Sequence, residues 1–481
     1  MQSNNSDTKG LFKHAFNYLG GNISVQALAI FSIPILTRLL SKSDFGMINV
    51  YMSYIGITGI ILTLNFHAAL SRYYFEIHKE DFKEFVGNSM AVVLITGVVF
   101  SSIAILLRHY IVAWLSIPME VFWGLLIISP MITLQNIFIS LKNITLQSKP
   151  IMLNTIILSY GRFFLMVFLI LFVTKTYLSR IYADIIIFSL SCIYYIKIIS
   201  EFYERPTFKK EHLKYIFIYS IPLLPHSLST IILHAFDSFM INSILGSSYN
   251  AMYSIAYTIG MLSFINYQSF QSSASPFFNQ MMAENRYDDV KNQSKDLNNI
   301  MLITSIGVSI FGVYAGIFLT TEKYYSAFDL IPIVVLGYFF MSSFQLYVRI
   351  MFFVKKTYFV ATTTLTSGIV NIILNSLLIP KFGYKIAAYN TAISFFIAFL
   401  VSWFICIKIL KNEGSLRMAD FLYPFALLTI IVAGSVLTTS VSIAHPIWTI
   451  LIKSVFMLIL IRVFFMKDIL ALYQIFIKKK G

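Results

Sequence analysis

The chain has 481 residues, of which 58% are apolar and only 12% charged, and its mean hydropathy is +0.77. A water-soluble domain of this length needs a far more charged surface, so the composition excludes one. The apolar residues fall in blocks of about twenty, which is the length of helix that spans the hydrocarbon core of a bilayer. The sequence therefore predicts a membrane protein.

The blocks are continuously apolar rather than alternating, which favours an all-α polytopic protein over a barrel. We expect about 14 transmembrane helices joined by short links, except for longer links at 67–85 and 272–298. In chain order the expected helices are 14–36, 46–66, 86–107, 119–141, 151–173, 181–199, 214–236, 249–271, 299–320, 328–350, 358–380, 385–407, 419–440 and 446–466.

The net charge of +15 raises the question of a nucleic-acid partner. If the N-terminus is cytoplasmic, the 36 Lys and Arg divide into 26 inside, 8 outside and 2 within helices, Arg162 and Lys453. Cytoplasmic loops of membrane proteins are enriched in Lys and Arg, and this distribution obeys that rule. The charge thus indicates topology, with both termini cytoplasmic, and attraction to anionic membrane lipid, and we expect no nucleic-acid partner.

The first twelve helices resemble two copies of six. A shift of 205 residues superposes 40–47 on 245–252, and a shift of 206 superposes 175–184 on 381–390. An even number of helices in each copy makes the copies parallel in topology, with a cavity expected between them. We therefore expect two six-helix lobes followed by two additional helices and a basic tail, with the boundaries at 1–205, 206–410 and 411–481.

The first helix of each copy carries polar or helix-breaking residues at corresponding positions, which are Asn17, Gly20 and Gly21 in one and Pro222 and His226 in the other. Matched interruptions in two repeats point to the central site of a transporter. The sequence thus predicts that Asn17, Gly21 and His226 line one cavity. Gly and Pro are also common in membrane helices, and a histidine there could equally satisfy freed backbone groups.

Three ionisable residues lie in or next to the expected helices. Arg162 is at the middle of helix 151–173, where a charge is costly unless it faces a wet cavity or a partner. It could bind a phosphate with two parallel hydrogen bonds, or form a structural ion pair. Asp184, near the start of one expected helix, and Asp237, just beyond another, are candidates for binding a coupling proton or Na⁺, or are simply helix-end carboxylates.

Three segments, 35–46, 220–225 leading to Asp237, and 378–383, resemble motifs of bacterial flippases for O-antigen or capsule repeat units, of the multidrug/oligosaccharidyl-lipid/polysaccharide exporter superfamily. The first reads Ile-Leu-Thr-Arg-Leu-Leu-Ser-Lys-Ser-Asp-Phe-Gly. The three motifs stand in the expected order and helix positions.

This resemblance implies a transporter that moves undecaprenyl-diphosphate-linked oligosaccharide from the inner to the outer leaflet by alternating access. It assigns binding of the diphosphate to Arg38 and Arg72, although both could also extend to the membrane surface. The same role falls on Arg162 because of its position in the middle of a membrane helix, not because of a matched motif. A polysaccharide polymerase and a chain-length regulator are the implied partners, and the bacterial cytoplasmic membrane is the implied location. No cofactor or metal is expected.

Other functions stay open. A drug/cation antiporter and a flippase for peptidoglycan precursor share this fold. A membrane sugar polymerase or glycosyltransferase would be an enzyme, which usually needs a large outer loop or a metal-binding carboxylate pair. The expected outer loops are short, and Asp288–Asp289, the nearest carboxylate pair, lies in a polar link with both signs of charge. We therefore expect that the protein is not an enzyme.

Overall fold

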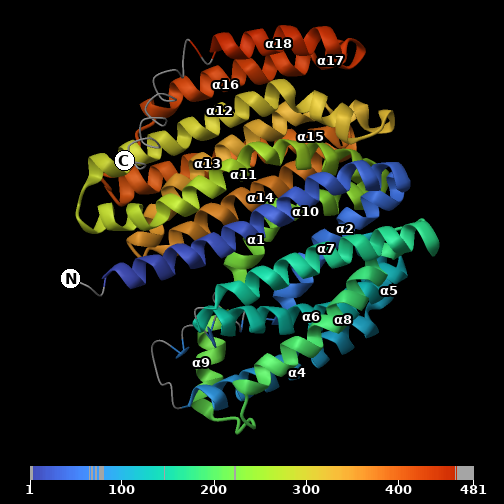
Figure 1. The fold of residues 1–481 in the computed structure, drawn as a ribbon, viewed down its shortest axis with the longest axis vertical. Coiled ribbons are helices and arrows are strands. Elements are labelled where there is room, and N and C mark those ends of the chain that lie inside the picture. The colour runs from blue at the N-terminus through green and yellow to red at the C-terminus, as the bar shows by residue number, and fades with distance from the viewer. Residues whose placement is uncertain are drawn as a thin grey trace.

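The computed structural model describes residues 4–63, 66, 69–70, 73–74, 81–145, 147–221, 224–460 and 462, and these ranges are almost entirely helical (Figure 1). The elements in chain order are α1 (Asn4–Leu39), α2 (Lys42–Thr63), α4 (Phe82–Leu106), α5 (Arg108–Leu115), α6 (Met119–Ile144), α7 (Ser148–Phe172), α8 (Leu178–Glu201), α9 (Lys210–Ser220), α10 (Leu224–Leu245), α11 (Ser247–Ala283), α12 (Tyr287–Leu319), η2 (Glu322–Ala327), α13 (Leu330–Phe353), α14 (Thr357–Phe382), α15 (Lys385–Phe404), η3 (Ile405–Ile409), α16 (Ala419–Leu437), α17 (Thr439–Ala444) and α18 (Pro446–Leu460).

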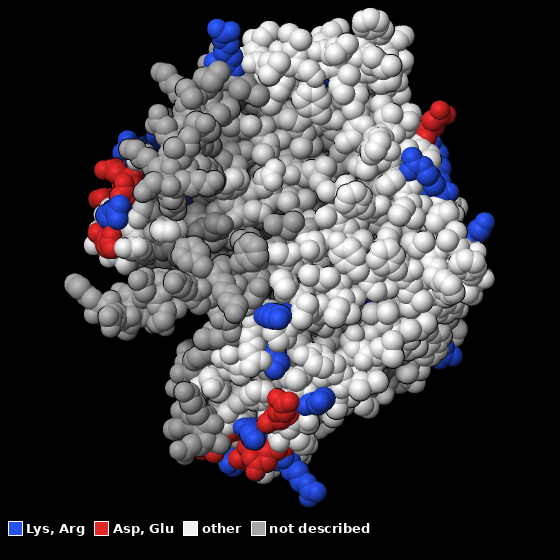
Figure 2. Space-filling model, viewed as in Figure 1, with Lys and Arg blue, Asp and Glu red and all other residues white. Residues whose placement is uncertain are grey.

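Nine of the described helices are long and apolar enough to cross a membrane, and 24–39 and 446–460 are shorter apolar segments. Large apolar side chains such as Leu94, Val98 and Ile193 are exposed on their surfaces. Figure 2 shows Lys, Arg, Asp and Glu mostly near the ends of the helices, with a broad uncharged band between them. This surface suits a bilayer, and the predicted all-helical, multi-pass membrane fold is confirmed.

Most helices run roughly alongside one another, with α10 to α18 in the upper part of Figure 1, α4 to α8 in the lower part, and α1 and α2 between them. Helix α1 packs on α7, while α2 packs on α6 and also on α10 and α11. We call the end where α1 begins the proximal end and the end where α1 finishes at Leu39 the distal end. Because short links reverse the chain, the helix ends alternate between these two sides.

The expected helix 214–236 is two helices. Helix α9 ends at Ser220 and packs against α4, and α10 begins at Leu224 and packs against α14, α2 and α11. Pro222, around which the interruption was predicted, lies between these two helices and outside the described residues. Because α10 continues to Leu245, Asp237 is inside a helix, and the prediction that it lies just beyond one was wrong.

The matching interruption in the first copy is absent, because α1 is one continuous helix through Gly20 and Gly21. A glycine keeps its backbone hydrogen bonds inside a helix and need not break it. Gly21 instead permits a close approach of α7, since a Cβ atom there would lie 3.6 Å from the Met152 Cα atom. The prediction of an unwound site in α1 was wrong.

The predicted link 272–298 is also mostly helical. Helix α11 has 37 residues and α12 has 33, and only residues 284–286 separate them. Apolar length marks the part of a helix that lies in lipid, but a helix can continue into water when its outer turns are polar. At the other end of α11, Gly246 has a φ of +93°, a conformation that separates α10 from α11 and favours glycine.

The buried apolar side chains form two clusters. The larger one joins the distal halves of α2, α6, α7 and α8 to α10 through α16. The smaller one contains residues from the proximal parts of α4, α6 and α8 and from α9, such as Phe85, Phe138, Tyr195 and Ile216. It also contains Phe66, Ala69, Leu70 and Tyr73. Among the described residues, the proximal parts of α4, α6 and α8 thus form their core with α9, which follows the predicted boundary at 205/206.

Candidate functional site

Asp237 of α10 is the centre of a buried polar cluster. Its Oδ1 atom accepts a hydrogen bond from the Asn375 Nδ2 atom at 2.6 Å. Its Oδ2 atom accepts one from the Tyr253 hydroxyl and one from the Thr391 hydroxyl, each at 2.5 Å. The donors come from α11, α14 and α15, so three helices converge on one carboxylate.

Two further amides extend this cluster. The Asn390 Nδ2 atom donates to the Asn375 Oδ1 atom at 2.9 Å, and Asn371 bonds both Thr391 and Asn375. All of these side chains are buried. Among the described residues, no Lys or Arg forms an ion pair with Asp237. Because an uncompensated buried charge is very costly, this carboxylate needs a proton or a small cation.

Asp184 of α8 is the centre of a second cluster with the opposite charge balance. Its Oδ2 atom lies 3.0 Å from the Arg180 Nε atom, and its Oδ1 atom lies 3.9 Å from the Arg162 Nε atom. Arg162 also donates to the Leu158 carbonyl at 2.8 Å and lies 5.0 Å above the Phe188 ring. The carboxylate is fully buried, whereas the arginine side chains are 20% and 12% exposed. One carboxylate between two guanidinium groups leaves one positive charge unbalanced.

The other predicted site residues do not join these clusters among the described residues. Arg38 is exposed at the distal end and donates to the Pro34 carbonyl of its own helix at 2.8 Å. Arg72 lies outside the described residues, and so do the side chains of Asn17 and His226, whose backbones lie in α1 and α10. The structure therefore brings Arg162 and Asp184 together, and separately builds a cluster around Asp237.

At the distal end, matching segments of the two copies contact each other. The Ser43 and Ser247 hydroxyl oxygens are 2.8 Å apart, and the Asn250 Nδ2 atom donates to the Gly46 carbonyl at 3.2 Å. A Cβ atom on Gly46 would lie 1.7 Å from the Ser247 carbonyl oxygen. The two hydrogen bonds join residues that are 204 positions apart, one fewer than the predicted shift of 205, so nearly equivalent residues of the two segments meet.

Two more contacts hold this end together. The Asn242 side chain of α10 donates to the Ser116 carbonyl at 2.9 Å, and the Lys323 Nζ atom donates to the Leu40 carbonyl at 2.8 Å. The distal end is therefore held closed by contacts between residues of the first segment, 1–205, and residues of the second, 206–410.

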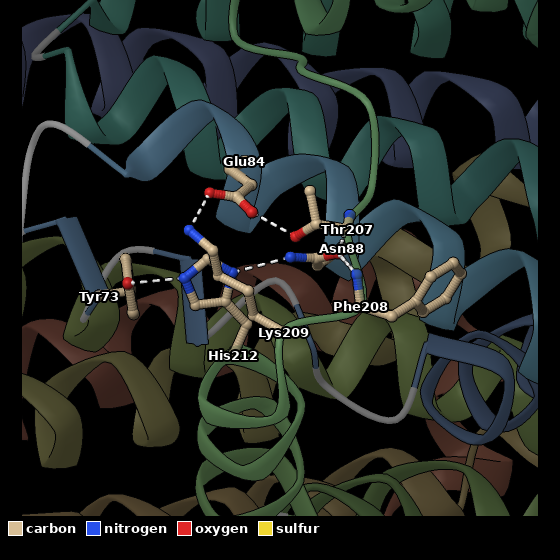
Figure 3. Close-up of polar contacts among 7 residues, drawn as sticks. All are labelled: Tyr73, Glu84, Asn88, Thr207, Phe208, Lys209 and His212. Carbon is tan, nitrogen blue, oxygen red and sulfur yellow. Dashed lines mark hydrogen bonds and ion pairs between the residues drawn. The ribbon is translucent and has the colours of Figure 1, made fainter.

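A network at the proximal end was missed by sequence reasoning (Figure 3). The Asn88 Oδ1 atom of α4 accepts the backbone N–H groups of Thr207 at 3.0 Å and Phe208 at 2.8 Å. This orients the amide so that its Nδ2 atom donates to the His212 Nδ1 atom at 2.8 Å. His212 therefore carries its proton on Nε2, which is 3.1 Å from the Tyr73 hydroxyl oxygen.

Glu84, one turn before Asn88 on α4, completes the network with an ion pair to Lys209 at 2.5 Å and a hydrogen bond from the Thr207 hydroxyl. These contacts hold the 202–209 link and α9 against α4. Burial lowers the pKa of His212 below its ordinary value. A polar Glu84–Asn88 pair one turn apart at the start of an apolar helix was the available signal, but its partners lie more than a hundred residues away.

A family model described as "Polysaccharide biosynthesis protein" matches residues 11–282, which is more than half of the chain. The chain is similar in structure to Lipid II flippase MurJ in an inward closed conformation, with a TM-score of 0.65 and 16% identity over 89% of this chain and 98% of that one. It is also similar to a point mutant of the Vibrio cholerae MATE transporter VcmN, with a TM-score of 0.57 and 15% identity over 86% and 100%.

A third similar structure is a MOP superfamily transporter from Pyrococcus furiosus, with a TM-score of 0.57 and 15% identity over 85% of this chain and 97% of that one. No curated protein sequence matches the chain. The structural likenesses show the fold, and the family model shows the sequence relationship. The chain therefore belongs to the polysaccharide biosynthesis protein family and has the fold of the multidrug/oligosaccharidyl-lipid/polysaccharide exporter superfamily.

Proposed function

We propose that the protein is a flippase that carries undecaprenyl-diphosphate-linked oligosaccharide units from the inner to the outer leaflet of the bacterial cytoplasmic membrane. The family supports a role in making a surface polysaccharide, and the fold supports transport rather than catalysis. The excess of Lys and Arg at the proximal end supports placing that end in the cytoplasm. The segments 1–205 and 206–410 would move as two lobes, with 411–481 attached to the second.

The unbalanced positive charge beside Asp184 is the observation that carries this proposal. A guanidinium matches the geometry of a phosphate and can bind it with two parallel hydrogen bonds. Arg162 and Arg180 share one carboxylate and are both partly exposed, so they can attract an anion that Asp184 does not fully neutralise. A charge at this depth costs about 3 kcal/mol on insertion scales, which a purely structural role has to justify.

Asp237 is the better candidate for the coupling ion. Asp184 already has two cationic partners, whereas the Asp237 cluster consists of neutral oxygen and nitrogen groups around one carboxylate. Carboxylate, amide and hydroxyl oxygens can surround Na⁺, and a protonated carboxyl group could equally form these bonds. Binding of either ion would remove the cost of a buried charge and stabilise the packing of α10 on α14 and α15.

Glycan export in a strain lacking the flippase tests the role of Arg162. Arg162→Ala should reach the membrane at the parent level and fail to support export, and Arg162→Lys should restore only part, because lysine keeps the charge and loses the planar fork. The double variant Arg162→Ala/Asp184→Asn separates binding from structure. If Arg162 only neutralises Asp184, the double variant should export normally. If Arg162 binds the diphosphate, the double variant should stay inactive.

The likeness to Lipid II flippase favours a peptidoglycan-precursor flippase as the second candidate. Expression in cells depleted of their own Lipid II flippase distinguishes the two, because only a peptidoglycan-precursor flippase should restore growth there. A drug/cation antiporter is less favoured, since an unbalanced arginine repels a cationic cargo. Glycan export should be lost on deletion of this gene, without a change in drug tolerance.

A further inference from the structure

An apolar cavity of about 500 Å³ lies in the distal half of the protein, between α2, α4, α5, α6 and α10. Its wall is rich in aromatic rings, contributed by Tyr54, Phe100, Trp114, Phe122, Phe236 and Phe239. Trp114 is 70% exposed and Ile103, another lining residue, is 47% exposed, so the cavity borders the surface that faces lipid. A hydrocarbon chain can therefore reach it sideways from the bilayer.

The lining offers little to a polar ligand. None of the described residues that line the cavity is charged. The Thr58 and Ser129 hydroxyls donate to carbonyls of their own helices at 3.0 and 2.6 Å, and the Tyr54 hydroxyl donates to the Leu115 carbonyl at 3.1 Å. A diphosphate would lose its hydration here and find few polar groups among the described lining residues. The chemistry of the wall thus selects hydrocarbon.

We propose that this cavity holds a segment of the polyprenyl tail of the transported lipid, an identity that rests on the function proposed above. Its volume lies in the range of pockets that enclose drug-sized molecules, so it fits part of one chain rather than a whole lipid. Acyl tails are as apolar as the wall, so burial alone does not choose between tails. Van der Waals contact can distinguish the two kinds of tail. The regular methyl branches and double bonds of a polyprenyl chain can fit between rigid aromatic rings, which an unbranched acyl chain would only partly contact.

The position of the cavity ties its occupancy to the transport cycle. The ring centroid of Phe239 on α10 lies 5.9 Å from that of Tyr54 and 5.5 Å from that of Trp114. Helix α10 therefore forms one wall of the cavity, against helices of the first segment. Opening of the distal end would remove this wall and release the tail. The same turn of α10 places Asp237 in the cluster with α14 and α15. One helix therefore contacts both the proposed ion site and the proposed tail site.

Trp114 provides a direct probe. A variant that keeps Trp114 and replaces the other three tryptophans, Trp123, Trp403 and Trp448, with phenylalanine is placed in nanodiscs of brominated phosphatidylcholine, whose chains quench tryptophan fluorescence. Unbrominated undecaprenyl phosphate should displace brominated chains and raise Trp114 emission to saturation. Dioleoyl phosphatidic acid, an anionic phosphate lipid with acyl tails, should not. A variant that keeps only Trp448, which is exposed on α18, should not respond to either lipid.

Filling the cavity provides the matched control. Ala104→Phe on α4 adds a ring inside it and should abolish the saturable rise, while Val98→Phe, on a lipid-facing position of the same helix, should preserve it. If Ala104→Phe does not reach the membrane, Ser101→Phe tests the same wall. Equal responses to both lipids, or a rise that survives the filling substitutions, would overturn the proposal. Since glycan export is not the readout, a chain that exports normally without a Trp114 response disproves the tail site alone. A saturable response in a chain that exports no glycan disproves only the proposed function.

Discussion

Substitution of Gly46 by alanine should open the distal end. The added Cβ atom would lie 1.7 Å from the Ser247 carbonyl oxygen, 2.6 Å from its carbonyl carbon and 3.1 Å from the Ala251 backbone nitrogen. These are backbone atoms, so no side-chain rotation relieves the clash. Overpacking of this kind costs about 1–3 kcal/mol. Because about 1.4 kcal/mol is a factor of ten, the closed state should become roughly 5- to 150-fold less populated relative to states in which α2 and α11 separate.

Spin labels at Lys175 and Lys381, equivalent positions of the two copies that are exposed near the distal end, measure this separation. Pulsed dipolar spectroscopy in nanodiscs should show a longer distance in Gly46→Ala than in the parent, together with reduced glycan export. Gly97→Ala is the matched control, because a Cβ atom at Gly97 meets nothing within 4 Å. An unchanged distance distribution with normal export would refute the reasoning, and would mean that α2 can shift without opening the end.

Three further predictions concern the ion site, the proximal network and the topology. If Asp237 binds Na⁺ or a proton, the melting temperature of the parent should rise on adding NaCl or on lowering the pH, respectively. Asp237→Asn should abolish this rise, whereas the control Asp329→Asn at the distal end should keep it. A parent whose melting temperature responds to neither change excludes an ion at Asp237. Burial lowers the pKa of His212, so the folded state binds fewer protons there than the unfolded state, and stability should fall as pH drops below about 6.5. His212→Gln should remove this part of the pH dependence in thermal unfolding, while substitution of the exposed His445 should not. A phosphatase fused after Gly481 should be inactive and a green-fluorescent fusion bright; the reverse result would place the chain end outside.

The helix-forming segments could be read from the sequence because lipid imposes a simple rule: each crossing must be an apolar run of about twenty residues whose backbone is bonded within itself. The positions of the helix ends were harder to predict from the sequence. Helix α11 continues to Ala283 beyond the apolar run, and α10 extends to Leu245, which places Asp237 inside the helix rather than after it. Polar residues interrupt the apolar run in both extensions, such as Asp237 and Asn242 in α10 and Ser272 and Ser273 in α11, so the run alone did not mark the helix ends.

The internal repeat stays a prediction, and the contacts of Ser43 with Ser247 and of Gly46 with Asn250 lie within one residue of its shift. The helices differ between the two segments, because the second has α9 and α10 where the first has the continuous α1. Proline removes a backbone donor and obstructs the preceding turn, whereas glycine only lowers helix propensity. The expectation of equivalent interruptions weighed the two residue types equally, and Pro222 lies outside the described residues.

Only the tertiary structure decided which polar residues meet. By itself the sequence determined the solvent of the protein, its helical class and the unusual depth of Arg162, since each depends on local composition or on spacing along the chain. It could not show that Arg162 shares Asp184 with Arg180, or that Asp237 gathers Tyr253 and Asn375. The partners of a buried charge are selected by the packing of helices that are distant in the chain, and no local pattern records that packing.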